Sequence, residues 1–144
     1  SYEQLFQTMR ALRLTYPEAE QMFKRMVFNV MATNYDDHTK NFSFLLKEGA
    51  KWQLAPAYDL CYAYHPTNPW VNQHTLSING KHKNLSLADL MTIAEANSVK
   101  QPKKIIAQIK ATVQDWATYA NKAQVEPSLS THVNDNLVAH TFII

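Results

Sequence analysis

Ionisable and amide side chains are concentrated in one short segment, residues 34–41, which reads NYDDHTKN. Asp36 and Asn41 lie five positions apart in it, and Asp59 follows further along the chain. Phosphoryl transfer needs one carboxylate that accepts or orients the proton of the attacking hydroxyl. It also needs an amide oxygen and a second carboxylate that hold Mg²⁺ against the nucleotide phosphates. Asp36 is therefore a candidate base, and Asn41 and Asp59 are candidate Mg²⁺ ligands.

The interval from Asp36 to Asn41 equals that of the protein-kinase catalytic loop, H-R-D-x-x-x-x-N, which precedes a metal-binding D-F-G segment. The residue identities differ, because Asn34-Tyr35 replace the histidine and arginine, and Asp59-Leu60-Cys61 replace D-F-G. An isolated Asp-Asp pair would more simply cap a turn. The interval to Asn41 selects Asp36 as the catalytic residue, so we interpret Asp37 as a neighbour that caps or binds the loop backbone.

The elements that must position these residues are mostly helices. Helical spacing of apolar residues and capping signals predict helices that start after Ser1, Thr15 and Ser86. A further helix is predicted from Pro102 through Trp116 to Ala120, and a weaker helical pattern follows Pro127.

A β-hairpin is predicted directly after the polar segment. Apolar residues alternate from Phe42 to Leu46 and again from Trp52 to Leu54, with a turn at Gly49 between them. Because a hairpin returns the chain to its starting point, we expect Asp36, Asn41 and Asp59 to converge. Residues 75–78 are a candidate short strand. The predicted fold class is α+β, mainly α, with one central hairpin.

The segments on either side of the hairpin resemble the HipA family of bacterial serine/threonine kinases, which are the toxins of toxin–antitoxin pairs. That family carries an Asp-x-His-x-Lys-Asn-x-Ser loop, found here at residues 36–43, and a Pro-x-Tyr-Asp-(Leu/Ile) segment, found here at residues 56–60. The resemblance implies that Asp36 is the catalytic base and that Asn41 and Asp59 bind Mg²⁺. It also implies contact with ATP, and the residues concerned are His38, Lys40, Asn41, Tyr58 and Asp59.

The resemblance covers residues 1–144 as one domain, and it is to the C-terminal helical lobe of this kinase-like fold only. The chain has two glycines, Gly49 and Gly80, which cannot build a glycine-rich loop that wraps phosphates. We therefore expect a C-terminal piece of a longer protein whose N-terminal lobe supplies that loop and the lysine that anchors ATP. By resemblance, the phosphate acceptor is a protein hydroxyl, including that of an aminoacyl-tRNA synthetase, and the partner is a DNA-binding antitoxin.

The composition of the chain limits its possible binding partners and cellular compartment. The net charge of +2 is too small to favour direct nucleic-acid binding or a membrane surface. A single cysteine, Cys61, excludes an internal disulfide and fits a reducing compartment. No signal peptide or membrane-spanning apolar run is apparent, which favours the bacterial cytoplasm. We interpret His65, His74 and His82 as surface residues, because they lack metal-ligand spacing.

Two other functions stay open at this point. One is a non-catalytic protein-binding module that retains the lobe. The other is a Mg²⁺-dependent phosphohydrolase built on Asp36, Asp37 and Asp59. Only kinase ancestry explains the interval to Asn41 together with the hairpin.

Overall fold

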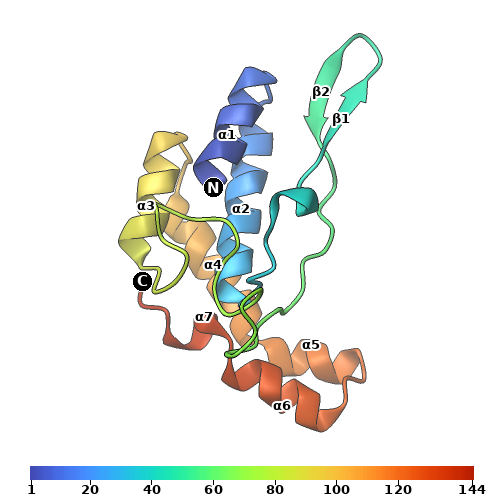
Figure 1. The fold of residues 1–144 in the computed structure, drawn as a ribbon, viewed down its shortest axis with the longest axis vertical. Helices are drawn as coiled ribbons and strands as arrows, with labels where there is room; N and C mark the ends of the chain where they lie inside the picture. Colours follow the sequence, from blue (N-terminus) through green and yellow to red (C-terminus); the bar gives the residue numbers. More distant parts are fainter.

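Seven α-helices and one β-hairpin make up residues 1–144 of this computed structural model (Figure 1). The helices are α1 (Tyr2–Ala11), α2 (Tyr16–Met31), α3 (Leu87–Ala96), α4 (Pro102–Gln114), α5 (Trp116–Lys122), α6 (Pro127–Asp135) and α7 (Val138–Thr141). The hairpin strands are β1 (Phe44–Lys47) and β2 (Lys51–Leu54), and a short 3₁₀ helix spans Thr39–Asn41. The expected fold class, α+β and mainly α, is confirmed.

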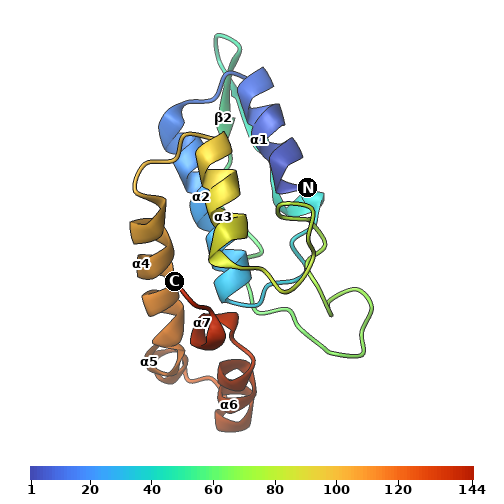
Figure 2. The same ribbon diagram turned by 90° about the vertical axis from the view of Figure 1, so that its left-hand side faces the viewer.

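Helix α2 is the centre of the fold, and it packs against α1, α4 and α7, while α3 packs against α4 (Figure 2). It begins where the sequence predicts, because the Glu18 carboxylate accepts hydrogen bonds from the backbone amide and the hydroxyl of Thr15. One face of α2 is fully buried. Each large apolar side chain on that face contributes about 2 kcal/mol by leaving water. The buried apolar residues are Met22, Phe23, Met26, Val27, Val30 and Met31.

The hairpin stands away from the helices (Figure 1). Phe44 pairs with Leu54 at its base, and the turn contains Gly49 with a φ of +76°, a value that glycine adopts without steric cost. Glu18 of α2 accepts a hydrogen bond from the Leu54 amide at 2.8 Å, which ties the base of the hairpin to α2. The first strand begins later than predicted, because Phe42 lies in the core against the Tyr2 ring.

Two sequence predictions about secondary structure are wrong. Residues 75–78 form no strand, and only one isolated bridge joins Ile78 to Lys81. The helix predicted from Pro102 to Ala120 ends at Gln114, and α5 begins after Asp115. Asp115 accepts a hydrogen bond from the Thr118 hydroxyl, which favours a new helix start, and the Trp116 indole donates to the Ser130 carbonyl of α6. None of the helices is both long and apolar enough to cross a membrane.

Candidate functional site

The polar loop before the hairpin and the segment after it lie side by side. The Tyr58 hydroxyl donates to the Lys40 carbonyl at 2.7 Å. The Asn34 side-chain amide donates to the Asp59 carbonyl at 3.3 Å, and Asn34 forms a parallel bridge with Ala63. Residues 34–41 and 58–63 are thus joined at both ends, as expected if the hairpin returns the chain to the site.

Asp36 and Asn41 share one closed turn of this loop. The Asn41 amide nitrogen donates to the Asp36 backbone carbonyl at 3.0 Å. The side-chain oxygen of Asn41, Oδ1, is the atom that could bind a metal ion, and it accepts no hydrogen bond from another residue. The Asp36 side chain is 45% exposed, and the His38 Nε2 lies 3.9 Å from Asp36 Oδ1. The side-chain oxygens of Asp36 and Asn41 are therefore available to a ligand.

Asp59 has a left-handed backbone, with a φ of +53°, although it is not glycine. Its carboxylate is exposed and accepts only a weak hydrogen bond, from the Cys61 thiol at 3.8 Å. Burial raises the pKa of that thiol, and the negative charges of Asp59 and Asp36 raise it further. The segment that carries Asp59 is also held to the loop by the hydrogen bond that the Asn34 side-chain amide donates to the Asp59 carbonyl.

The donor set fits Mg²⁺ better than a soft metal. Asn41 and Asp59 offer only oxygen atoms, and the raised pKa of Cys61 disfavours the thiolate that would bind zinc. No group of three or more His, Cys, Asp or Glu side chains is arranged to hold a metal. Mg²⁺ is usually held by one or two protein oxygens together with waters and substrate phosphates. Asn41 and Asp59 would supply such a partial shell.

The other residues predicted to contact ATP are His38, Lys40 and Tyr58. The His38 Nδ1 is buried without a hydrogen-bond partner, while its Nε2 faces Asp36. The Lys40 side chain is exposed and forms no ion pair. The Tyr58 side chain is 41% exposed, and its hydroxyl holds the loop at Lys40. The side chains of His38, Lys40 and Tyr58 are thus at least partly exposed, so a ligand can reach them.

Asp37 plays a structural part, and His74 is placed differently from the sequence prediction. Asp37 is buried, and its Oδ1 accepts hydrogen bonds from the backbone amides of Thr75 and Leu76. Its Oδ2 accepts from the Tyr2 hydroxyl and lies 2.8 Å from His74 Nδ1, which must carry the proton because a carboxylate only accepts. His74, predicted at the surface, is 2% exposed. Its burial is possible because Asp37 satisfies it.

The buried hydrogen bonds continue from Asp37 to Asp59. The Tyr2 hydroxyl accepts from the Asn29 amide at 2.9 Å, and Asn29 Oδ1 accepts from the Asn34 amide at 2.9 Å. The same Asn34 amide reaches the Asp59 carbonyl. Burial raises the pKa of Tyr2, and the charge of Asp37 raises it further, so the hydroxyl remains a donor. This continuous path fixes the two halves of the site relative to each other.

Sequence reasoning did not single out Tyr2 or Asn29. One signal was available for Asn29, because it is a polar residue on the otherwise apolar face of a predicted helix. Buried polar side chains in native structures are almost always hydrogen-bonded, so such a residue predicts a buried partner. The residues near Asn29 in the sequence do not indicate which residue that partner is.

One protein family matches the chain. A family described as the HipA-like C-terminal domain matches residues 1–117. The matched range contains every candidate site residue and ends at the start of α5. No curated protein matches the sequence.

Proposed function

The chain belongs to the family of HipA-like C-terminal domains, and we propose that it is the catalytic lobe of an ATP- and Mg²⁺-dependent serine/threonine kinase. One observation carries the proposal. Two segments on either side of a hairpin, which carry Asp36, Asn41 and Asp59, are hydrogen-bonded together, and the side-chain oxygens of Asp36 and Asn41 accept no hydrogen bond while those of Asp59 accept only a weak one. That set matches the base and the two metal ligands that phosphoryl transfer requires.

In this proposal, Asp36 acts on the acceptor hydroxyl. A serine or threonine oxygen attacks the terminal phosphorus of ATP, its proton passes to the Asp36 carboxylate, and ADP leaves. The exposure of Asp36 allows a protein side chain to reach it. The hydrogen bond from Asn41 to the Asp36 carbonyl holds the base and the metal ligand in one turn, which favours a fixed reacting geometry.

Asn41 and Asp59 would hold Mg²⁺, which neutralises phosphate charge when it is bound. Lys40 would add positive charge at the phosphates, and His38, which faces Asp36, would add hydrogen bonds there. Tyr58 flanks the same region and would border the nucleotide. The two glycines of the chain cannot form a phosphate-wrapping loop, so another lobe of the full-length protein would supply it.

The partners belong to the same proposal. The acceptor would be a hydroxyl of another protein, with an aminoacyl-tRNA synthetase as one candidate. A small DNA-binding antitoxin would bind the kinase, as the toxin–antitoxin context of the family suggests.

A phosphohydrolase built on Asp36, Asp37 and Asp59 fits the structure less well. Asp37 is 1% exposed, and its two oxygens already accept from four donors. A metal could bind there only if buried hydrogen bonds were broken, and each such loss costs about 1–3 kcal/mol.

The test is phosphoryl transfer by the full-length protein. The rate of labelled γ-phosphate transfer from ATP to a serine/threonine acceptor would be compared for the wild type, Asp36→Asn and Asp135→Asn. Asp135 is an exposed carboxylate on α6 that forms no ion pair, so it is a matched control. Loss of a general base lowers a rate about 10²–10⁴-fold, which is the range expected for Asp36→Asn. An Asp36→Asn enzyme with the wild-type rate would refute the assignment.

A further inference from the structure

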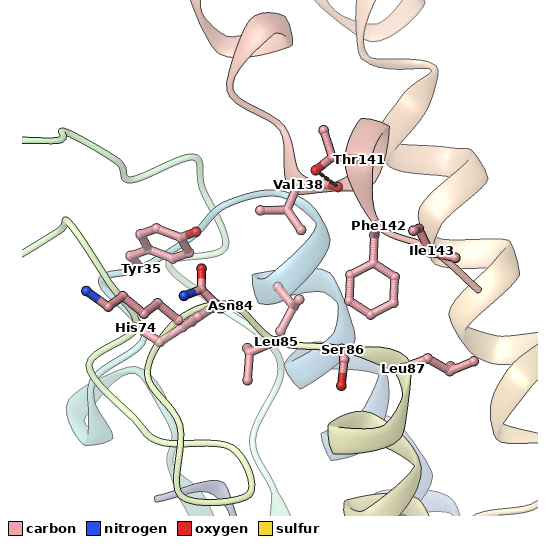
Figure 3. A pocket seen from close by; sticks show the side chains of 12 residues that line it. Tyr35, His74, Asn84, Leu85, Ser86, Leu87, Val138, Thr141, Phe142 and Ile143 are labelled. Atoms are coloured by element: carbon pink, nitrogen blue, oxygen red, sulfur yellow. Dashed lines mark hydrogen bonds between the residues drawn. The ribbon is translucent and has the colours of Figure 1, made fainter.

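A cavity of about 350 Å³ adjoins the buried Asp37–His74 pair. It lies between the end of α2, the loop that leads into α3, and α7 (Figure 3). Its volume falls at the lower end of the range of small-molecule sites, about 300–1,000 Å³. None of the residues proposed for ATP or Mg²⁺ lines it, so it is separate from the site described above.

One side of the cavity is polar. Figure 3 shows Tyr35, His74 and Asn84 grouped together there, and Lys83 also lines the cavity. The Lys83 ammonium, the Tyr35 hydroxyl and the Asn84 side chain make no hydrogen bond or ion pair with another residue. His74 is buried, and its Nδ1 is held by Asp37 while its Nε2 has no protein partner. Four polar groups are therefore uncommitted at one side of the cavity.

The opposite side is mostly apolar, although Ser86 and Thr141 also line it. Val138 and Phe142 line it from the α7 region, with Leu85 below them and Ile143 at the edge (Figure 3). A ligand that fills this cavity must therefore be amphiphilic, with a polar head at one end and an apolar body at the other.

The charge at the polar side is positive. Lys83 is a cation without a paired acid. The buried carboxylate of Asp37 is occupied by four donors, and Asp89 in α3 pairs with Lys81. Burial raises the pKa of Tyr35, so its hydroxyl is a hydrogen-bond donor at neutral pH. A cation and a hydroxyl donor together favour an anionic head.

We propose that this cavity binds a small organic carboxylate with one aromatic or branched aliphatic body. The carboxylate pairs with Lys83 and accepts from the Tyr35 hydroxyl and the Asn84 amide, while the body lies against Val138 and Phe142. A purely apolar ligand would leave the polar groups without partners, and a metal ion would find no cluster of carboxylate or imidazole ligands. This site goes beyond the proposed kinase function and does not depend on it.

The site also touches the catalytic loop. His74 lines the cavity and contacts Asp37, which is adjacent in sequence to Asp36. A bound ligand is therefore expected to shift the NMR signals of that loop as well as those of the cavity residues.

The experiment is an NMR titration of the ¹⁵N-labelled chain with three probes. Phenylacetate carries head and body, phenylacetamide has the same size without the charge, and acetate is the head alone. The proposal predicts saturable shifts for phenylacetate at Tyr35, His74, Leu85 and Phe142. It predicts affinity at least about fivefold weaker for each of the other probes, because each lacks one half of the interaction.

Variants assign the binding to this cavity. Lys83→Gln is expected to weaken phenylacetate binding about fivefold or more, while Lys103→Gln, at an exposed position on α4 outside the cavity, leaves it unchanged. Tyr35→Phe should also weaken binding and keep the ring in place, so a folding defect is not the cause. Equal binding of phenylacetate and phenylacetamide, no effect of Lys83→Gln, or no saturable shift up to about 20 mM overturns the proposal.

Discussion

The side-chain amide of Asn34 donates to the Asp59 carbonyl at 3.3 Å and to Asn29 Oδ1 at 2.9 Å. One buried residue thereby joins α2 to the segment that carries the second carboxylate of the site. Such support matters for Asp59, because a left-handed backbone is less favourable for aspartate than for glycine. We infer that Asn34 holds the backbone of Asp59 in this conformation.

Replacing Asn34 by Asp should disturb Asp59 without changing the size of the side chain. The variant turns the donor into an acceptor that faces the Asp59 carbonyl and Asn29 Oδ1. We expect the free energy of unfolding to fall by about 2 kcal/mol, and Mn²⁺ binding at Asp59 to weaken. Urea denaturation and a Mn²⁺ titration monitored by NMR measure the two effects separately.

Thr33→Val is the control for that variant. Thr33 is equally buried, and its hydroxyl donates to the Asn136 carbonyl and accepts from the Val138 amide, away from the site. This substitution should reduce stability and leave Mn²⁺ binding unchanged. If both variants changed Mn²⁺ binding to the same extent, Asn34 would have only a general structural role.

Substitutions of Asp36 and Asp59 should affect different kinetic steps, because the proposed roles of the two residues differ. In the full-length protein, Asp36→Asn keeps the shape of the side chain and removes the proton acceptor, so ATP binding persists while phosphoryl transfer is lost. Asp59→Asn removes a metal ligand, so Mg²⁺-dependent nucleotide binding weakens. Nucleotide titrations and transfer rates of both variants test this split, and a reversed pattern would mean that the roles are exchanged.

The pKa of the Cys61 thiol tests whether the carboxylates of Asp36 and Asp59 lie near each other. Burial raises its pKa first, and the negative charges of Asp59 and Asp36 raise it further, because they disfavour a thiolate. Asp59→Asn and Asp36→Asn should each lower the thiol pKa, and alkylation near pH 8 should become faster. The pH profile of the alkylation rate gives the pKa, and Asp135→Asn should leave it unchanged. An unchanged profile in both site variants would contradict the proximity of these groups.

Asp89 should make stability depend on acid pH. Burial alone would raise the pKa of this carboxyl, but hydrogen bonds from Lys81, Ser86 and Asn79 outweigh burial and hold the pKa well below its usual range. A group whose pKa is lowered on folding stabilises the protein above its unfolded pKa, about 3.9, and this stabilisation is lost as the pH falls toward the folded pKa.

Asp89→Asn should therefore cost about 2 kcal/mol of unfolding free energy at pH 7 and less near pH 3. Urea denaturation of wild type and variant at both pH values measures the difference. A cost that is the same at pH 3 and pH 7 would mean that the charge of Asp89 contributes nothing.

Local signals in the sequence were sufficient for much of the fold. Ser1 and Thr15 begin helices through short-range capping, and Gly49 marks the hairpin turn, so each can be recognised within a few residues. The spacing of Asp36 and Asn41 is local as well. That the segment carrying Asp59 returns to this loop followed from one further inference, that a hairpin brings the chain back.

The features that sequence reasoning missed depend on distant partners. His74 looks like a surface histidine because the carboxylate that satisfies it, Asp37, is far away in the sequence. The end of α4 is similar, since Trp116 continues the helical pattern but bonds to Ser130 on another helix. Periodicity carries no information about such contacts, because they are fixed only when the elements pack together.

The most direct test of the site is where Mn²⁺, a paramagnetic substitute for Mg²⁺, binds on this chain. We predict that substoichiometric Mn²⁺ broadens the amide signals of Asp36, Asn41 and Asp59 first, and that Asp59→Asn removes this preference while Asp135→Asn does not. Broadening spread evenly over the exposed carboxylates, or unaffected by Asp59→Asn, would contradict the assignment of Asn41 and Asp59 as the metal ligands of a kinase.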